Sequence, residues 1–167
     1  YSDSLNKYVD GAFSLVRREL DLLNSSLIDA IPCHTETSKT IVEYFFGAKG
    51  KRVRPALYFQ SAMLCKFSSA NNMKLAMASE LIHAASLLHD DVIDDSPLRR
   101  NKPTAHSLWG QESAILVGDL IYSRASELVA ESGNCKIVSA YASTIRKMSE
   151  GELLQLENIG NLKLSET

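Results

Sequence analysis

The sequence lacks any uninterrupted apolar run approaching the roughly 18 residues that a membrane-spanning helix needs. It also lacks an excess of positive charge, because 18 basic residues face 20 acidic ones and the formal net charge is −2. No global basic field exists that would hold a nucleic acid. We therefore expect neither a transmembrane segment nor a nucleic-acid partner.

Cysteine is scarce, with three widely spaced residues: Cys33, Cys65 and Cys135. An odd number at such spacing favours neither a disulfide framework nor a zinc site. Free thiols are typical of a reducing compartment. We expect the cytoplasm, or the mitochondrial matrix if the source is eukaryotic.

Proline is scarce as well, and the four prolines all lie before residue 104, which leaves long segments with an uninterrupted helical period. No segment shows the alternation of a strand. The pattern predicts helices over residues 5–31, 40–46, 55–67, 73–95, 113–131 and 136–158. Asn71 or Asn72 is expected to cap the fourth helix, and residues 97–110 are predicted to form a loop. Because no linker or repeat is evident, residues 1–167 are expected to form a single all-α helical domain.

Four carboxylates crowd into six residues near the carboxyl end of the fourth predicted helix: Asp90, Asp91, Asp94 and Asp95. Like charges four residues apart repel each other, and the negative end of the helix dipole adds to the repulsion. A solvated acidic face is one interpretation. The almost purely apolar segment 77–88 instead places the acids at the mouth of a buried surface. Two carboxylates one turn apart suit Mg²⁺, so we favour a magnesium site in this cluster.

Two loops flank this acidic cluster and are basic. The first contains Lys49, Lys51, Arg52 and Arg54 beside Gly47 and Gly50, and the second contains Arg99, Arg100 and Lys102. Either loop alone is most simply a solvated one, but together they indicate two anionic groups, one held through a metal and one held by cations. His83 lies two helical turns before Asp90 on the same predicted face and joins the site. No site role is predicted for His89 or His106.

Several motifs follow one another in order along the chain. They are Gly50–Pro55, His83–Leu88, Asp90–Asp94, Arg99-Arg100, Pro103-Thr104, His106 and Gly118-Asp119. In residue type and spacing they resemble the trans-isoprenyl diphosphate synthases, the head-to-tail prenyltransferases, over about residues 45–160. The resemblance implies the N-terminal portion of the isoprenoid-synthase helical bundle, and it is closest to the long-chain octaprenyl and hexaprenyl type.

The resemblance also implies roles for individual residues. Asp90 and Asp94 would bind Mg²⁺ that bridges to an allylic diphosphate, with Asp91 in support. Arg99 would contact that diphosphate directly. The diphosphate of isopentenyl diphosphate would be held by Lys51, Arg54, His83 and Arg100.

The implied reaction ionises the allylic C–O bond, lets the isopentenyl double bond attack the carbocation, and ends with the loss of a proton. Stabilising the departing pyrophosphate is electrostatic catalysis, and no nucleophilic side chain is needed. The resemblance further implies a homodimer.

A long all-trans polyprenyl diphosphate for a quinone side chain, such as that of ubiquinone, is the expected product. Ala85 and Ser86 are small and lie one turn before Asp90, so a growing chain anchored there can pass them. Close helix packing is the alternative reason for small residues at these positions. The segment Ser149–Gln155 also resembles the quinone-chain branch more than the short-chain branch.

A second aspartate-rich motif and a Lys-Thr pair, both expected farther along in the family, are missing from this sequence. The last residues, Leu164–Thr167, are typical of the start of a helix, so we expect the domain to be incomplete at its carboxyl end and inactive alone. The chain is then part of a longer polyprenyl diphosphate synthase, or a short non-catalytic subunit that binds diphosphates or a catalytic partner. A terpene cyclase ranks last, because it needs no second diphosphate site.

Overall fold

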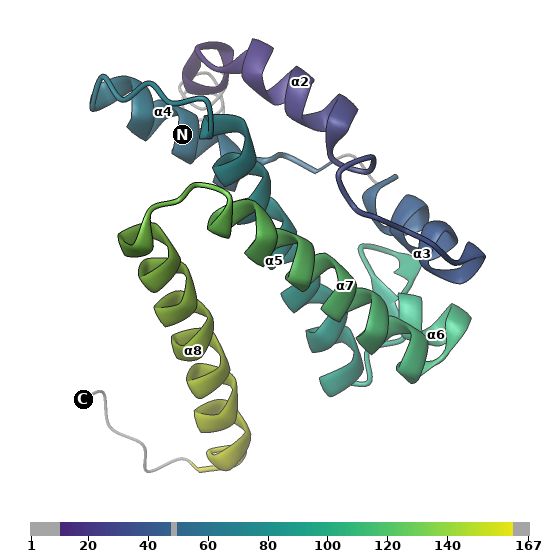
Figure 1. The fold of residues 1–167 in the computed structure, drawn as a ribbon. Coiled ribbons are helices and arrows are strands. Elements are labelled where there is room, and N and C mark those ends of the chain that lie inside the picture. The colour runs from purple at the N-terminus through teal and green to yellow at the C-terminus, as the bar shows by residue number, and fades with distance from the viewer. Residues whose placement is uncertain (1–10, 48–49, 162–167) are drawn as a thin grey trace.

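The computed structural model describes residues 11–47 and 50–161, whose regular structure is helical apart from one two-residue antiparallel ladder. The helices are α2 (Arg17–Ser26), α3 (Glu36–Phe46), α4 (Val53–Leu64), α5 (Asn72–Ile93), α6 (Ala105–Trp109), α7 (Gln111–Ala130) and α8 (Cys135–Glu157) (Figure 1). The ladder joins β1 (Leu98–Arg99) to β2 (Lys102–Pro103). The predicted all-α class is confirmed. In the described part of the chain, no helix is long and apolar enough to cross a membrane.

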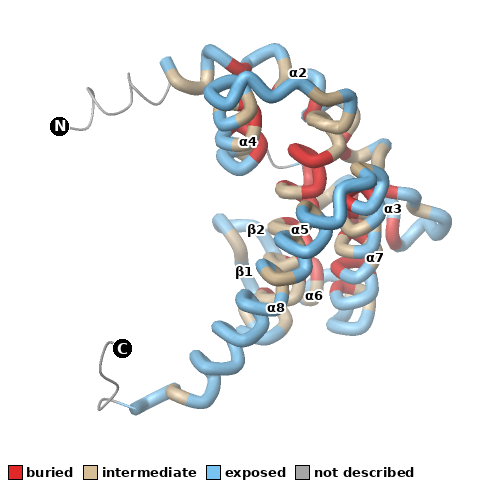
Figure 2. Tube along the Cα trace, turned by 60° about the vertical axis from the view of Figure 1, so that its left-hand side comes forward, coloured by how far each residue is buried: buried red, intermediate tan, exposed pale blue. Residues whose placement is uncertain are grey.

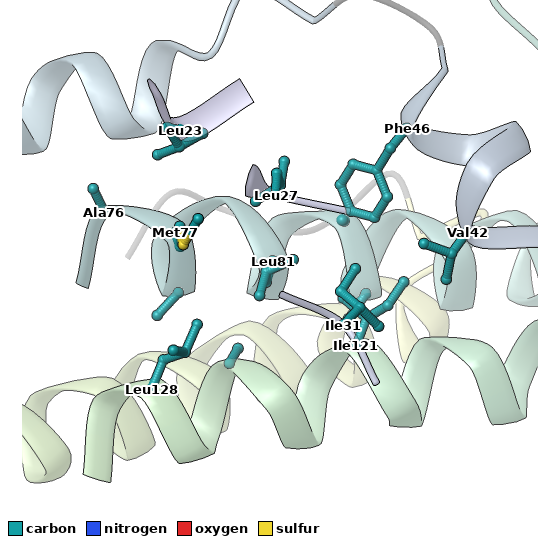
Figure 3. Close-up of a cluster of buried hydrophobic side chains, with 14 of the residues drawn as sticks. Leu23, Leu27, Ile31, Val42, Phe46, Ala76, Met77, Leu81, Ile121 and Leu128 are labelled. Carbon is teal, nitrogen blue, oxygen red and sulfur yellow. The ribbon is translucent and has the colours of Figure 1, made fainter. Parts of the chain in front are cut away.

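Helices α5 and α7 pack against each other in antiparallel orientation at the centre of the structure (Figure 1). Lys74 near the start of α5 pairs with Glu131 just after α7, whereas His89 near the end of α5 contacts Ile115 near the start of α7. Both helices bury small residues, which let two backbones approach closely: Ala84, Ala85, Ala114, Gly118 and Ala125. Leu81 of α5 lies above Ile121 and Leu128 of α7 in Figure 3.

Helices α2 and α3 cover the opposite side of α5. Leu23 and Leu27 come from α2 and the turn after it, Val42 and Phe46 come from α3, and all four lie over α5 in Figure 3. In contrast, α8 has no buried residue, and it is exposed over most of its length in Figure 2. The core therefore surrounds α5, and α8 is peripheral.

The first predicted helix, over residues 5–31, is wrong in its extent. Residues 5–10 lie outside the described residues, and from residue 11 the chain forms a helical turn, a break at residues 15–16 and then α2. Helix α2 ends at Ser26 and does not continue to Pro32. The hydroxyls of Ser25 and Ser26 donate to the carbonyl oxygen of Leu22, at 2.9 and 2.7 Å. Such bonds compete with those that would continue a helix.

Helix ends also differ from the prediction where side chains cap them. Helix α3 begins earlier than predicted, because Thr35 and Ser38 form a reciprocal capping box. Asn71 occupies the N-cap position of α5, as predicted, but its side chain does not cap the helix. Its amide instead donates to the carbonyl oxygen of Ser132 at 3.5 Å. Helix α4 ends at Leu64, before the predicted residue 67.

Residues 97–110, predicted to form a loop, instead contain both the β1–β2 hairpin and α6. Arg100 and Asn101 connect the two strands with φ angles of 51° and 63°, the left-handed pair that a two-residue hairpin turn requires. The phenol of Tyr44 in α3 donates to the carbonyl oxygen of Pro103 at 2.8 Å. This bond ties the hairpin to α3.

Gly118→Ala is expected to destabilise the protein, because a Cβ at residue 118 would overlap the imidazole ring of His89. Helix propensity alone predicts that this substitution stabilises the protein, because Gly118 lies inside α7 and alanine favours a helix more than glycine does. We expect the free energy of unfolding, measured by urea denaturation, to fall by about 1–3 kcal/mol.

Gly151→Ala is the matched control, because Gly151 lies inside α8 and a Cβ there would meet no atom within 4 Å. This variant should gain up to about 1 kcal/mol from helix propensity. Equal effects of the two substitutions would contradict the close approach of α5 to α7.

Candidate active site

A cavity of about 660 Å³ lies between the end of α3, the start of α4, helix α5 and the β1–β2 hairpin. Six of the predicted site residues line it: Lys51, Arg54, His83, Asp91, Arg99 and Arg100. Among the described residues, Asp90 and Asp94 are not part of its wall, and Lys49 lies outside the described residues. The structure thus brings the two predicted basic segments together around one space.

The first basic segment meets this cavity at the amino end of α4. Lys51 and Arg54 are exposed, and within the described residues neither forms an ion pair. Helix α4 begins at Val53 without a side-chain cap and without an acidic residue in its first turn. Uncapped N–H groups and the helix dipole attract anions. Two cations beside an open helix start suit a phosphate-like ligand.

His83 lies on the α5 side of the cavity. Burial lowers the pKa of His83, and the positive charge of Arg54 lowers it further. Glu80 acts in the opposite direction, whereas Arg99 and Arg100 also lower the pKa. The imidazole is therefore neutral at neutral pH in the unliganded protein, and an entering anion would favour its protonation.

Asp91 is the buried member of the acidic cluster, at 4% exposure. Arg99 donates from Nε to both of its carboxylate oxygens at 2.9 Å, and Arg99 Nη2 lies 2.8 Å from Oδ1. The backbone carbonyl of Asp91 accepts from the Ser96 N–H at 3.0 Å. These bonds fix the hairpin to the end of α5. Arg99, predicted only as a ligand of diphosphate, therefore has a second role as the partner of Asp91. The opposite charges eight residues apart in the sequence were the one signal of this pair.

Two histidines without a predicted site role have structural partners. His106 Nδ1 lies 3.1 Å from Thr104 Oγ1, which donates to the carbonyl oxygen of Ser96 at 2.8 Å. His89 Nε2 lies 3.5 Å from Asp119 Oδ1 and packs over the α7 backbone at Gly118. His106 therefore contacts the segment between β2 and α6, and His89 contacts α7, and both of these neighbour the acidic end of α5.

Asp90 has different surroundings from Asp91. Burial raises the pKa of Asp90, and the nearby carboxylates of Glu152 and Asp94 raise it further. The described residues contain no ready-made cluster of three or more His, Cys, Asp or Glu side chains that could hold a metal ion. His83 and Asp90 lie seven residues apart in one continuous helix, about two turns, so they share a face of α5. The first cavity is lined by His83 together with Asp91. The crowding around Asp90 is nevertheless a place where a cation would relieve repulsion.

Ala85 and Ser86 also differ in their surroundings. Ala85 is buried in the core at 1% exposure, whereas Ser86 is half-buried and its hydroxyl donates to the carbonyl oxygen of His83 at 2.9 Å.

A second, mostly apolar cavity of about 610 Å³ lies between α4, α5, α7 and α8, with Ser79 in its wall. Ser79, Ser86 and Asp90 share one face of α5, and the helix rise separates the first from the last by about 16 Å.

The sequence model of the family described as "Polyprenyl synthetase" matches residues 35–167. Among curated proteins, the chain is 38% identical over 162 residues to the all trans-polyprenyl-diphosphate synthase PDSS1 of Mus musculus, covering 93% of this chain and 39% of that protein. It is 30% identical over 152 residues to the octaprenyl diphosphate synthase of Escherichia coli (strain K12), covering 91% of this chain and 47% of that protein.

Solved structures show the same relationship. A polyprenyl synthase from Caulobacter crescentus CB15, complexed with calcium and isoprenyl diphosphate, matches with a TM-score of 0.89 at 37% identity, covering 95% of this chain and 48% of that one. A decaprenyl diphosphate synthase from Rhodobacter capsulatus matches with a TM-score of 0.88 at 32% identity, covering 93% and 48%. The chain spans less than half the length of each of these four relatives.

Asp91→Ala is expected to lower the free energy of unfolding by about 3 kcal/mol, because it breaks a mostly buried ion pair and releases the hairpin. Asp94→Ala is the matched control, since Asp94 is exposed and its removal relieves like-charge repulsion. The control should unfold at the same urea concentration as the unmodified protein or slightly above it. A similar loss in both variants would mean that Asp91 has no special structural role.

Proposed function

The chain belongs to the polyprenyl synthetase family, and on this basis we propose that the full-length protein joins isopentenyl diphosphate head to tail to an allylic diphosphate. Its fold is the N-terminal portion of the isoprenoid-synthase helical bundle, as the sequence predicted. The product is a long-chain all-trans polyprenyl diphosphate for a quinone side chain. Octaprenyl and decaprenyl diphosphate synthases among its relatives support this product class.

The observation that carries the proposal is the convergence of two basic segments on one cavity. Lys51 and Arg54 come from one segment, Arg100 comes from the other, and His83 lies in the same wall. A diphosphate has several negative charges, and arginine meets phosphate oxygens through paired hydrogen bonds. We assign the diphosphate of isopentenyl diphosphate to this cavity.

The allylic diphosphate is assigned to the acidic end of α5. Asp90 and Asp94 would hold Mg²⁺ there, and the crowded carboxylates that raise the pKa of Asp90 fit a hard cation. When bound, Mg²⁺ supplies positive charge to the leaving diphosphate. Asp91 orients Arg99 beside this end of the helix, which favours contact between its guanidinium and the same substrate.

The chemistry needs no nucleophilic side chain. The allylic C–O bond breaks, and its electron pair leaves with the diphosphate. The isopentenyl double bond then attacks the carbocation, and a proton leaves to form the new double bond. The residues of this chain contribute by holding both diphosphates at fixed positions, so that the reacting carbons meet.

The alternative of a short non-catalytic diphosphate-binding subunit is not favoured, because the named relatives are synthases. A terpene cyclase would leave Lys51, Arg54 and Arg100 without a second diphosphate to bind. The homodimer and the cytoplasmic or mitochondrial location stay predictions.

The activity is tested by incubating the full-length protein with farnesyl diphosphate, isopentenyl diphosphate and Mg²⁺ and then sizing the products. Products longer than geranylgeranyl diphosphate are expected. Ser86→Phe should shorten them, because a ring between Asp90 and the second cavity would block the growing chain. Ser25→Phe, at an exposed position on α2, is the control and should leave product length unchanged.

The two possible failures of this experiment are distinct. If the unmodified protein forms no extended product, the proposed reaction is wrong. If it forms long products and Ser86→Phe forms the same ones, only the path along α5 is wrong.

Binding of inorganic pyrophosphate should depend on pH through His83. The pKa of His83 is lowered in the unliganded protein by burial and by Arg54, and a bound anion would raise it, so binding takes up a proton. Proton uptake makes affinity fall as the pH rises from about 6 to 8. Binding is measured by calorimetry over this pH range for the unmodified protein and for His83→Gln. The protonation of pyrophosphate itself affects both proteins equally, so the difference between their pH profiles reports on His83. Identical pH profiles would remove His83 from the site.

A further inference from the structure

Arg52 differs from the other basic residues of its segment because it is enclosed. Its side chain is 12% exposed, and its Nη1 lies 2.9 Å from Glu80 Oε1. Its Nε donates to Asn24 Oδ1 at 2.8 Å, and its guanidinium carbon lies 5.9 Å from the centre of the Phe46 ring. A single arginine thus joins α2, α3 and α5 at the entrance to α4.

The backbone around Arg52 depends on these contacts. Arg52 has a φ of 49°, a left-handed conformation that is strained for a residue with a β-carbon, and α4 begins at the next residue. The guanidinium folds back beside Gly50, where a Cβ would lie 3.3 Å from Nη1 and 3.9 Å from Glu80 Oε1. The bonds of one side chain therefore maintain the shape of the turn from Gly50 to Arg54.

The ionised carboxylate of Glu80 would be energetically unfavourable in this position without Arg52. Its carboxylate is buried, at 8% exposure for the residue, and it lines a cavity that we assign to an anion. An unpaired carboxylate there would lose its hydration and repel the ligand. Paired with Arg52, it adds little net charge to the cavity. Lys51 and Arg54 then remain as the exposed cations of this segment.

We propose that Arg52 is a positioning residue: anchored by Glu80 and Asn24, it holds the Gly50–Arg54 turn in the shape that presents Lys51 and Arg54 to a diphosphate. The proposal rests on the proposed function, which places the diphosphate of isopentenyl diphosphate in this cavity. Arg52 also lines the cavity, but its guanidinium is held by Glu80 and Asn24, so in this proposal it acts through the turn and not by binding the substrate.

Glu80→Gln separates this role from direct binding by the sign of its effect. The substitution removes a negative charge from the cavity and weakens the hold on Arg52. If Arg52 bound the diphosphate directly, a freer guanidinium and a more positive cavity would tighten binding. If Arg52 positions the turn, binding weakens although the cavity has become more positive.

Calorimetric titration of the full-length protein with inorganic pyrophosphate measures this effect. EDTA keeps metal-dependent binding out of the measurement, and a pH near 8 keeps His83 neutral in the unliganded protein. We expect Glu80→Gln to bind about tenfold more weakly than the unmodified protein. Glu131→Gln is the matched control, because it removes the same charge from the exposed pair with Lys74 and should bind normally.

The outcomes also separate this inference from the proposed function. If Glu80→Gln binds pyrophosphate as tightly as the unmodified protein, or more tightly, the positioning role is overturned and the cavity assignment stands. If the unmodified protein does not bind pyrophosphate, the cavity assignment fails and the positioning role falls with it.

Gly50→Ala gives a second test of the positioning role and changes no charge. It also serves as the test if Glu80→Gln does not fold. Its Cβ would lie 3.3 Å from Arg52 Nη1 and would press on that guanidinium. In the turnover assay we expect the KM for isopentenyl diphosphate to rise about tenfold, with kcat and the KM for the allylic substrate nearly unchanged. An unchanged KM for isopentenyl diphosphate, or a loss of kcat alone, would overturn the positioning role.

Discussion

The close antiparallel contact between α5 and α7 is the constraint on which the rest of the structure depends. His89 rests on the α7 backbone at Gly118, so α5 cannot rotate about its axis without a clash. With this rotation fixed, Glu80 and Asp91 line the first cavity, while Asp90 lies near Glu152 of α8. A single helix thereby places acidic side chains in two different surroundings.

The four carboxylates at the end of α5 do not act as a unit. Asp91 is buried and paired with Arg99, whereas Asp94 and Asp95 are exposed. Asp90 lies between these extremes: it is half-buried, and burial together with neighbouring carboxylates raises its pKa. A bound cation would therefore relieve most repulsion at Asp90, because an arginine already neutralises Asp91. Adjacent acids in a sequence do not reveal this division, which depends on the rotation of the helix.

The sequence predicted long helices well and non-local contacts poorly. Helices α5, α7 and α8 match the predicted ranges to within two residues at each end, because many apolar positions define their period. The hairpin and the anchoring of the basic segment were missed. They depend on pairs such as Tyr44 with Pro103 and Arg52 with Glu80, which lie 59 and 28 residues apart. Residue types alone showed that both segments are basic, but not which cations stay exposed.

The two acids that α5 contributes to the first cavity, Glu80 and Asp91, are each paired with an arginine from a neighbouring loop. Glu80 and Asp91 lie eleven residues apart, close to three helical turns, so they share a face. Each binds an arginine from a different loop, Arg52 or Arg99, and an exposed cation stands directly beside each arginine in the chain. A paired acid and arginine add little net charge, yet they fix the backbone of the neighbouring cation. Less conformational freedom is then lost when a ligand binds. Because α5 carries both acids, it fixes the spacing of the two arginine-bearing loops before any ligand binds.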